Sequence, residues 1–153
     1  MDQPILLRHD TGAIATLTLN APDSFNALSD AMLAALAAQI ESLAADRAIK
    51  VVVLKAVGRA FCAGHDLKEM QAGRAAPDAG AAYFQSLFAR CGAVMMGLQS
   101  LPQPVIAQVH AIATAAGCQL VASCDLVVAA SGVRFGVNGV NIAVVAVLLM
   151  KAL

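Results

Sequence analysis

Apolar and polar positions alternate along several short segments of the chain, and these segments predict β-strands. Residues 5–10 and 12–20 are two such segments around a turn at residues 10–12, where small or polar side chains alternate with apolar ones. Residues 49–57 are a β-branched run, which is typical of a strand buried on both faces. The other predicted strands are the apolar segments 104–113 and 125–130.

Helical spacing replaces this alternation in two long segments. Ser29 is a suitable N-cap, and residues 29–47 follow it with large apolar side chains on one helical face. These side chains are Met32, Leu33, Leu36, Ile40 and Leu43. Residues 81–101 predict a second long helix, which Pro102 and Pro104 bring to an end.

Shorter segments complete the pattern. Residues 58–70 contain a turn followed by the start of a helix, residues 114–124 predict a helix of small residues, and residues 71–80 look like a mobile loop. The order β-β-α-β-α-β-α-β predicts an α/β fold with a largely parallel sheet. Since the 153 residues contain no internal repeat and no clear boundary, we expect one domain.

Composition narrows the possible partners. Ten basic and ten acidic residues give no net charge, so nothing favours nucleic acid or an anionic membrane surface. The chain is 59% hydrophobic and only 13% charged, and most of its apolar residues are small. This composition favours helices packed tightly on a buried sheet.

Two weakly charged stretches of the chain allow either a membrane span or a buried layer. Residues 91–124 contain no charged side chain and are long enough to cross a bilayer, but glutamines, prolines and a histidine interrupt them. Residues 135–150 are more apolar, yet they are short and carry Asn138 and Asn141. We therefore expect a buried layer of a soluble assembly. Residues 1–10 show no targeting pattern, which predicts a cytoplasmic protein.

Cysteines and histidines give no metal pattern. Four cysteines lie in apolar surroundings without C-x-x-C spacing, so we expect free, buried thiols. The three histidines are too scattered to suggest a metal cluster.

One strand–turn–helix motif occurs twice in the sequence: an apolar strand is followed by a turn of very small residues and then by a helix. Residues 51–57 lead into "CAGHDLKEM" at 62–70, and residues 105–110 lead into "ATAAGCQL" at 113–120. A helix start exposes unpaired N–H groups, and two such ends that converge can stabilise a developing oxyanion by about 10²–10³ in rate per donor. For either turn alone, close packing is the more common reason for small residues between a strand and a helix.

Four segments together resemble the crotonase superfamily, and within it the enoyl-CoA hydratase domain-containing members. They are "FNALSDAML", "VVVLKAVGRAFCAGHDLKEM", "QPVIAQVHAIATAAGCQLVASCDLVVAA" and "RFGVNGVNI". The resemblance implies a spiral of ββα turns that binds an acyl-CoA and holds its thioester carbonyl, or the enolate, between two backbone N–H groups. It covers residues 1–141, the expected acyl-CoA-binding core, and leaves 142–153 as a divergent apolar segment.

The resemblance also implies individual roles. The two donors are the main-chain N–H groups of His65 and Ala116, and Gly64 permits the bend that turns the first of them inward. The acyl-CoA channel is lined by Ala63, Gly64, Asp66, Leu67 and Lys68. No metal or separate cofactor is implied, because coenzyme A enters as part of the substrate.

This sequence departs from the family at both catalytic glutamates of the hydratases. The first falls on Gln119 and the second on Gly139. An amide is no general base near neutral pH and glycine has no side chain, so hydration by two carboxylates is not supported. Gln119 remains a candidate for orienting water or substrate by hydrogen bonding.

Other side chains near the first turn have two interpretations each. The His65 imidazole titrates near neutral pH and could act chemically, or it is a partly exposed turn residue. Asp66 is a base or, more commonly, an N-cap. Glu69 is expected to be a solvated helix residue, and Cys118 a small buried residue rather than a nucleophile.

Three functions follow from this sequence. The first is an enoyl-CoA hydratase/isomerase-like enzyme, a lyase or isomerase, with thioester hydrolysis as a further reaction. The second is a non-catalytic acyl-CoA binder, and the third a fragment without independent function. A dinucleotide-binding enzyme is disfavoured because the first turn lacks G-x-G-x-x-G.

Self-association is also expected. Relatives in the family form trimers or hexamers, so the resemblance implies a homo-oligomer. Family members are longer than this chain, which predicts an exposed apolar patch.

Overall fold

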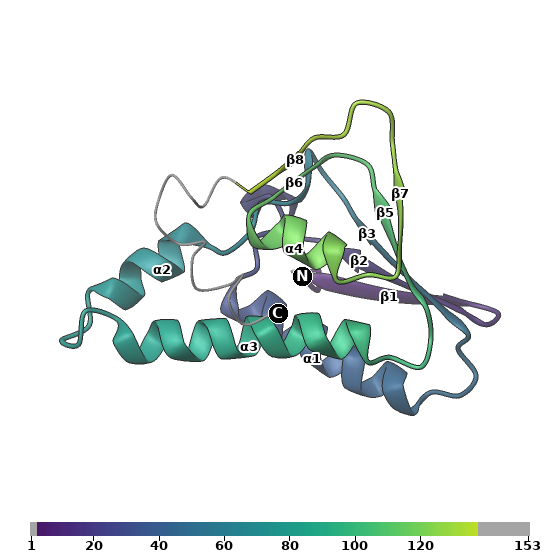
Figure 1. The fold of residues 1–153 in the computed structure, drawn as a ribbon, viewed down its shortest axis with the longest axis horizontal. Helices are drawn as coiled ribbons and strands as arrows, with labels where there is room; N and C mark the ends of the chain where they lie inside the picture. The colour runs from purple at the N-terminus through teal and green to yellow at the C-terminus, as the bar shows by residue number, and fades with distance from the viewer. Residues whose placement is uncertain (1–2, 138–153) are drawn as a thin grey trace.

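The computed structural model describes residues 3–137 (Figure 1). The strands are β1 (Leu6–Thr11), β2 (Ile14–Leu19), β3 (Val51–Ala56), β4 (Ala60–Cys62), β5 (Val105–Val109), β6 (Ile112–Thr114), β7 (Leu126–Ala129) and β8 (Phe135–Gly136). The helices are α1 (Asp30–Ala45), α2 (Leu67–Arg74), α3 (Ala81–Gln99) and α4 (Ala116–Ala122), with a short 3₁₀ turn η1 (Pro22–Ser24).

The strands form two sheets. The larger has the order β1-β2-β3-β5-β7, in which β1 runs antiparallel to β2 and every other neighbour is parallel. The smaller sheet, β4-β6-β8, is parallel throughout. The predicted α/β fold with a largely parallel sheet is therefore confirmed.

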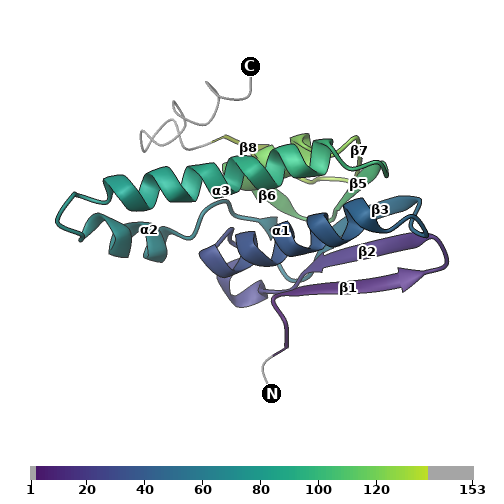
Figure 2. The same cartoon turned by 90° about the horizontal axis from the view of Figure 1, so that it is seen from below.

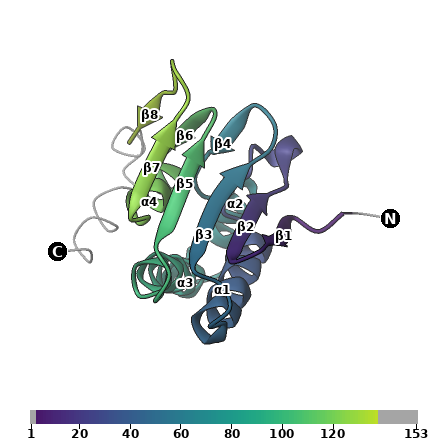
Figure 3. The same cartoon turned by 90° about the vertical axis from the view of Figure 1, so that its right-hand side faces the viewer.

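Helices α1 and α3 run side by side and pack on one face of the large sheet (Figures 2 and 3). The five apolar residues predicted for the inner face of α1 are all buried. The Ser29 hydroxyl accepts a hydrogen bond from the Met32 N–H at 3.2 Å, so the predicted N-cap is confirmed. Local spacing and capping thus account for α1.

The prediction that residues 49–57 are buried on both faces is wrong. Val52 and Leu54 are completely buried, whereas Val51 and Val53 are half-buried and Lys55 is exposed. The reason is that α1 and α3 cover only the face that carries Val52 and Leu54.

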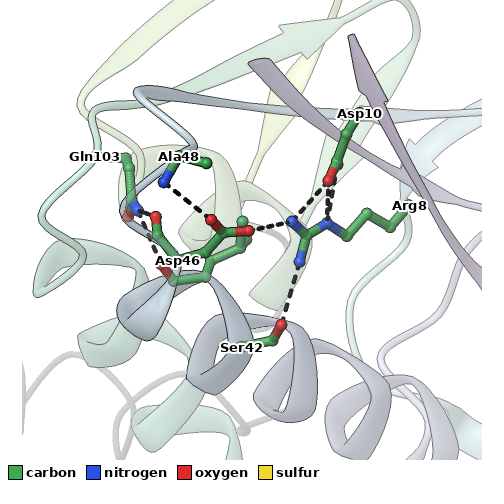
Figure 4. Close-up of polar contacts among 7 residues, drawn as sticks. Arg8, Asp10, Ser42, Asp46, Ala48 and Gln103 are labelled. Carbon is green, nitrogen blue, oxygen red and sulfur yellow. Dashed lines mark hydrogen bonds and ion pairs between the residues drawn. The ribbon is translucent and has the colours of Figure 1, made fainter. Parts of the chain in front are cut away.

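Polar contacts fasten the end of α1 to the sheet (Figure 4). The Arg8 guanidinium on β1 donates to the Asp10 carboxylate at 2.8 Å and to the Asp46 carboxylate, just after α1, at 2.9 Å. These hydrogen bonds lower the pKa of both carboxyl groups. The Gln103 amide donates to two main-chain carbonyls at the end of α1, at 2.8 and 3.0 Å, which links α1 to the segment before β5.

Two elements differ from the sequence prediction. Residues 104–113, expected as one strand, are divided between β5 in the large sheet and β6 in the small one. Residues 71–80, expected as a loop, begin inside α2, which continues to Arg74. Both differences have a long-range cause, because β6 pairs with β4 and β8, and α2 packs against α3.

An exposed apolar surface lies on β7 and β8. Every residue of β7 is exposed, although the strand itself is as apolar as β5. The large exposed side chains there are Leu126, Val127, Val128, Phe135 and Val137. The expected apolar patch is therefore present, and self-association stays a prediction. Among the described residues, no helix has both the length and the apolar character needed to cross a membrane.

Candidate functional site

The two predicted turns follow neighbouring strands of the small sheet. β4 and β6 pair in parallel, with Ala60 opposite Ile112 and Cys62 opposite Ala113. Since parallel strands end at the same edge of a sheet, the residues after each strand lie next to each other. The turn at Ala63–His65 therefore faces the turn that begins α4.

Gly64 is in direct contact with the second turn. Its φ of +91° is a conformation that side chains disfavour. A Cβ on Gly64 would also lie 3.0 Å from the Ala115 Cβ and 3.2 Å from the main-chain nitrogen of Ala116. Glycine is thus required twice at this position, for its backbone angle and for the close approach.

The main-chain N–H groups of His65 and Ala116 have no hydrogen-bond acceptor within residues 3–137. Several neighbouring donors are engaged: Ala115 N–H donates to the Gly136 carbonyl at 2.7 Å, and the Cys118 and Gln119 N–H groups donate to the Ala115 carbonyl. Unpaired N–H groups in buried positions are uncommon in proteins. These two remain available to a ligand oxygen.

The second turn contains a strained residue. Ala115 has a φ of +52° and a ψ of −126°, a combination rare for a residue with a side chain. Such strain persists where the surrounding structure enforces it, and it is common at ligand sites. Here it precedes the free N–H of Ala116.

A buried loop holds the first turn in place. Leu28 N–H donates to the Gly64 carbonyl at 2.7 Å, and Ala63 N–H donates to the Phe25 carbonyl at 3.1 Å. The Asn26 side chain is completely buried. It donates to the main-chain carbonyl of Val57, just after β3, at 2.8 Å and to that of Ala60, the first residue of β4, at 2.9 Å. No role was predicted for Asn26, although an asparagine among turn residues is a signal for such bonds.

Close packing also contributes at the second turn. A Cβ on Gly117 would overlap the carbonyl of Cys62, so the first turn of α4 lies directly on the end of β4. The packing explanation for the small residues is thus correct at Gly117. It does not account for the unpaired N–H of Ala116.

The His65 side chain is buried, with 9% of its surface exposed, so the interpretation as a partly exposed turn residue is wrong. Its ring meets the Phe88 ring of α3 edge-on, with centroids 5.9 Å apart. Burial lowers the pKa of the imidazole, while the Leu28 carbonyl and the Asp30 charge oppose the shift. The ring is therefore neutral at neutral pH.

Asp66 is the N-cap of α2, as one of its two interpretations predicted. Its carboxylate accepts hydrogen bonds from the N–H groups of Lys68 at 2.8 Å and Glu69 at 3.2 Å. Of the other expected channel residues, Ala63 is half-buried, whereas Leu67 and Lys68 are exposed on the first turn of α2.

Glu69 differs from its prediction as a solvated residue. It is half-buried, and its carboxylate accepts a hydrogen bond from the Asp30 N–H at 2.8 Å. The Asp30 carboxylate in turn accepts from Arg90 of α3 at 2.7 Å. Glu69 therefore joins α2 to the first turn of α1, a contact between residues that are far apart in the sequence.

One residue of α4 differs from its prediction. Gln119 and Cys118 are both half-buried, so the prediction of a buried Cys118 is wrong. Gly139, the other position of a family glutamate, lies outside the described residues.

The cysteines are free thiols in the structure. Burial raises the pKa of Cys62 to about 12, of Cys91 to about 11 and of Cys124 to about 12, so these three thiols stay protonated at neutral pH. Within residues 3–137, no three histidine, cysteine, aspartate or glutamate side chains come together as a metal site.

Comparison with known proteins identifies the family. The sequence profile of the enoyl-CoA hydratase/isomerase family matches residues 9–153. The chain belongs to this family. The human enoyl-CoA hydratase domain-containing protein 3, mitochondrial, is 43% identical over 129 residues, which are 84% of this chain and 41% of the human protein. The chain spans about half the length of the curated relatives it matches, or somewhat less.

Solved structures of this family have the same fold. The enoyl-CoA hydratase of Mycobacterium smegmatis is 54% identical, with a TM-score of 0.87 over 97% of this chain and 58% of that protein. The human protein superimposes with a TM-score of 0.84 at 37% identity, over 97% of this chain and 58% of its own. The resemblance to the crotonase superfamily is confirmed in sequence and in fold. The vertebrate relatives are named mitochondrial, which differs from the cytoplasmic compartment expected here.

Proposed function

We propose that this family member binds acyl-CoA thioesters and holds the thioester oxygen between the main-chain N–H groups of His65 and Ala116. The observation that carries the proposal is the approach of Gly64 to the Ala116 nitrogen, together with the absence of any acceptor for either N–H within residues 3–137. Two fixed donors at one oxygen stabilise charge as it develops on a thioester carbonyl or its enolate.

The surroundings of the two donors suit this role. Hydrogen bonds from the loop at Phe25–Leu28 fix the first turn, so the His65 N–H needs little reorganisation when a ligand binds. The half-buried Ala63 and the exposed Leu67 offer apolar surface beside the donors, and the exposed Lys68 offers a cation for the coenzyme's phosphates. Asp66 contributes by capping α2 rather than as a base. Coenzyme A is proposed as part of the substrate, with no other cofactor.

The proposed reaction is an enoyl-CoA hydration or isomerisation, with thioester hydrolysis as a further possibility. Gln119 occupies the position of one family glutamate, and its amide can orient a water or substrate without accepting a proton. That same residue favours a second function, a non-catalytic acyl-CoA binder. We also propose a homo-oligomer, in line with the apolar surface on β7 and β8.

Calorimetry with butyryl-CoA, paired with a hydratase assay on crotonyl-CoA, tests the proposal. Binding together with turnover supports the enzyme, and binding without turnover supports the non-catalytic binder. Free coenzyme A is titrated at the same concentrations for comparison. If the folded protein binds no thioester and no free coenzyme A, the proposal is wrong. Sedimentation velocity and circular dichroism on the same sample establish that the protein is folded and not aggregated.

A further inference from the structure

Asn26 is a completely buried polar residue, and its side chain ties its loop to the two strands that precede the first turn. The amide nitrogen donates to the main-chain carbonyls of Val57 at 2.8 Å and Ala60 at 2.9 Å. The amide oxygen accepts a hydrogen bond from the Ala21 N–H at 2.8 Å. The loop around Asn26 is therefore bound to the end of β3 and to the start of β4.

The backbone of this loop is held in a strained form. Phe25 and Asn26 both have a φ of +53°, in the left-handed region. Asparagine adopts this region more readily than most residues, whereas an aromatic residue does so rarely. Strain of this kind persists where the surrounding structure enforces it. The side-chain hydrogen bonds of Asn26 supply such a constraint.

The same loop fixes the orientation of one peptide group in the first turn. The Gly64 carbonyl and the His65 N–H belong to a single planar trans peptide group, so they point in opposite directions. The Leu28 N–H donates to that carbonyl at 2.7 Å, and Leu28 pairs with His65 in a parallel bridge. On the other side of Gly64, the Ala63 N–H donates to the Phe25 carbonyl at 3.1 Å. A carbonyl held in this way also fixes the direction of the His65 N–H.

We propose that Asn26 is a positioning residue for the first thioester donor: it holds the loop whose bond to the Gly64 carbonyl aims the His65 N–H. The inference rests on the proposed function, because it concerns a donor that the proposal assigns to the thioester oxygen. Asn26 acts through the peptide group and does not touch the substrate. Fixed donors polarise a carbonyl better than mobile ones, because they need no reorganisation as charge develops.

Infrared difference spectroscopy of butyryl-CoA, isotope-labelled at its thioester carbonyl, tests the inference. Hydrogen bonds to a carbonyl oxygen lower its stretching frequency, so the band of the bound thioester reports how well the donors are aimed. In Asn26→Ala the shift on binding should fall to about half or less of its value in the unmodified protein, because one of the two donors is misdirected. Spectra are recorded at saturating ligand, so weaker binding does not itself change the shift.

Two further variants separate positioning from general stability and from backbone strain. Leu43→Ala removes a completely buried side chain near the end of α1, so it should keep the full shift although the fold loses stability. Asn26→Gly relieves the strain at a φ of +53° but lacks the side-chain bonds. It should therefore lose the shift as Asn26→Ala does.

The outcomes distinguish the inference from the proposed function. An unchanged shift in Asn26→Ala, an equal loss in Leu43→Ala, or a full shift in Asn26→Gly overturns the inference and leaves the thioester site in place. If the unmodified protein does not bind butyryl-CoA, or binds it without a shift, the proposed function fails and the inference fails with it. If Asn26→Ala does not fold, Asn26→Ser, which keeps one hydroxyl donor, decides: a reduced shift supports the inference and a full shift overturns it.

Discussion

Gly64 lies against the main-chain nitrogen of Ala116, and the space between them is too small for a side chain. The two residues belong to turns that follow different strands, and the pairing of β4 with β6 brings them together. The close approach of these two residues sets the distance between the two proposed donors. Adding a single methyl group at Gly64 therefore tests whether that distance matters for binding.

Gly64→Ala should abolish binding of butyryl-CoA, or weaken it by at least tenfold. The added Cβ would meet the Ala116 nitrogen at 3.2 Å and force the two turns apart, and the φ of +91° would strain the alanine. Isothermal titration calorimetry measures the effect. Gly132→Ala is the matched control, because Gly132 has a φ of +81° but nothing near its Cβ position. Equal loss of binding in both variants would point to general destabilisation and not to the donor pair.

Removal of the Glu69 carboxylate should destabilise the fold by about 1–3 kcal/mol. The carboxylate accepts a hydrogen bond from the Asp30 N–H at the start of α1, and bonds to charged groups contribute in this range. Urea denaturation of Glu69→Ala measures the loss. Glu69→Gln keeps an acceptor and should lose less, while Glu41→Ala, on the exposed side of α1, should change little. A neutral result for Glu69→Ala would mean that water replaces the cap at no cost.

Asn26→Ala should cost about 2–4 kcal/mol, since several polar groups lose their partners together. The side chain donates to the carbonyls of Val57 and Ala60 and accepts from the Ala21 N–H. Thermal unfolding of the variant gives the loss. Asn20→Ala, whose amide makes one exposed bond to the Pro4 carbonyl, is the control and should cost well under half as much. Similar losses at both sites would remove the case for Asn26 as the support of the first turn.

Stability should fall as the pH drops below the ordinary range of a histidine, and part of the fall should come from His65. Burial lowers the pKa of its imidazole in the folded protein, so below the unfolded-state pKa the unfolded chain binds more protons. The slope from one such group is at most about 1.4 kcal/mol per pH unit. The aspartates whose pKa is lowered take up protons only in more acidic solution, so they do not contribute to the slope in this range. Urea denaturation between neutral and mildly acidic pH should show a shallower slope for His65→Gln, and identical slopes would contradict the assignment.

Val128→Lys should reduce self-association of the protein. Val128 is 62% exposed on β7, in the middle of the apolar surface, and a charge there opposes burial against another chain. Sedimentation velocity at several concentrations measures the change. Gln71→Lys adds the same charge at an exposed position of α2, away from β7, and should leave association as it was. If both variants behave like the unmodified protein, the β7 surface is not the site of contact.

Much of the fold follows from the sequence alone, because the responsible interactions are local. The spacing of Met32, Leu36 and Leu43 defines the buried face of α1, and Ser29 caps it through an N–H only three residues away. Alternation similarly predicts the β1–β2 hairpin, and the resemblance to a family locates the two glycine turns. In each case the decisive residues are neighbours along the chain.

The tertiary structure decided what depends on contacts between distant residues. Only the pairing of β4, β6 and β8 divides residues 104–113 between two sheets and sets Gly64 beside Ala116. Likewise, only the packing of α2 and α3 turns Glu69 into a cap for α1 and encloses His65 beside Phe88. A sequence records which groups a residue carries, whereas burial and hydrogen-bond partners depend on segments that meet only when the chain is folded.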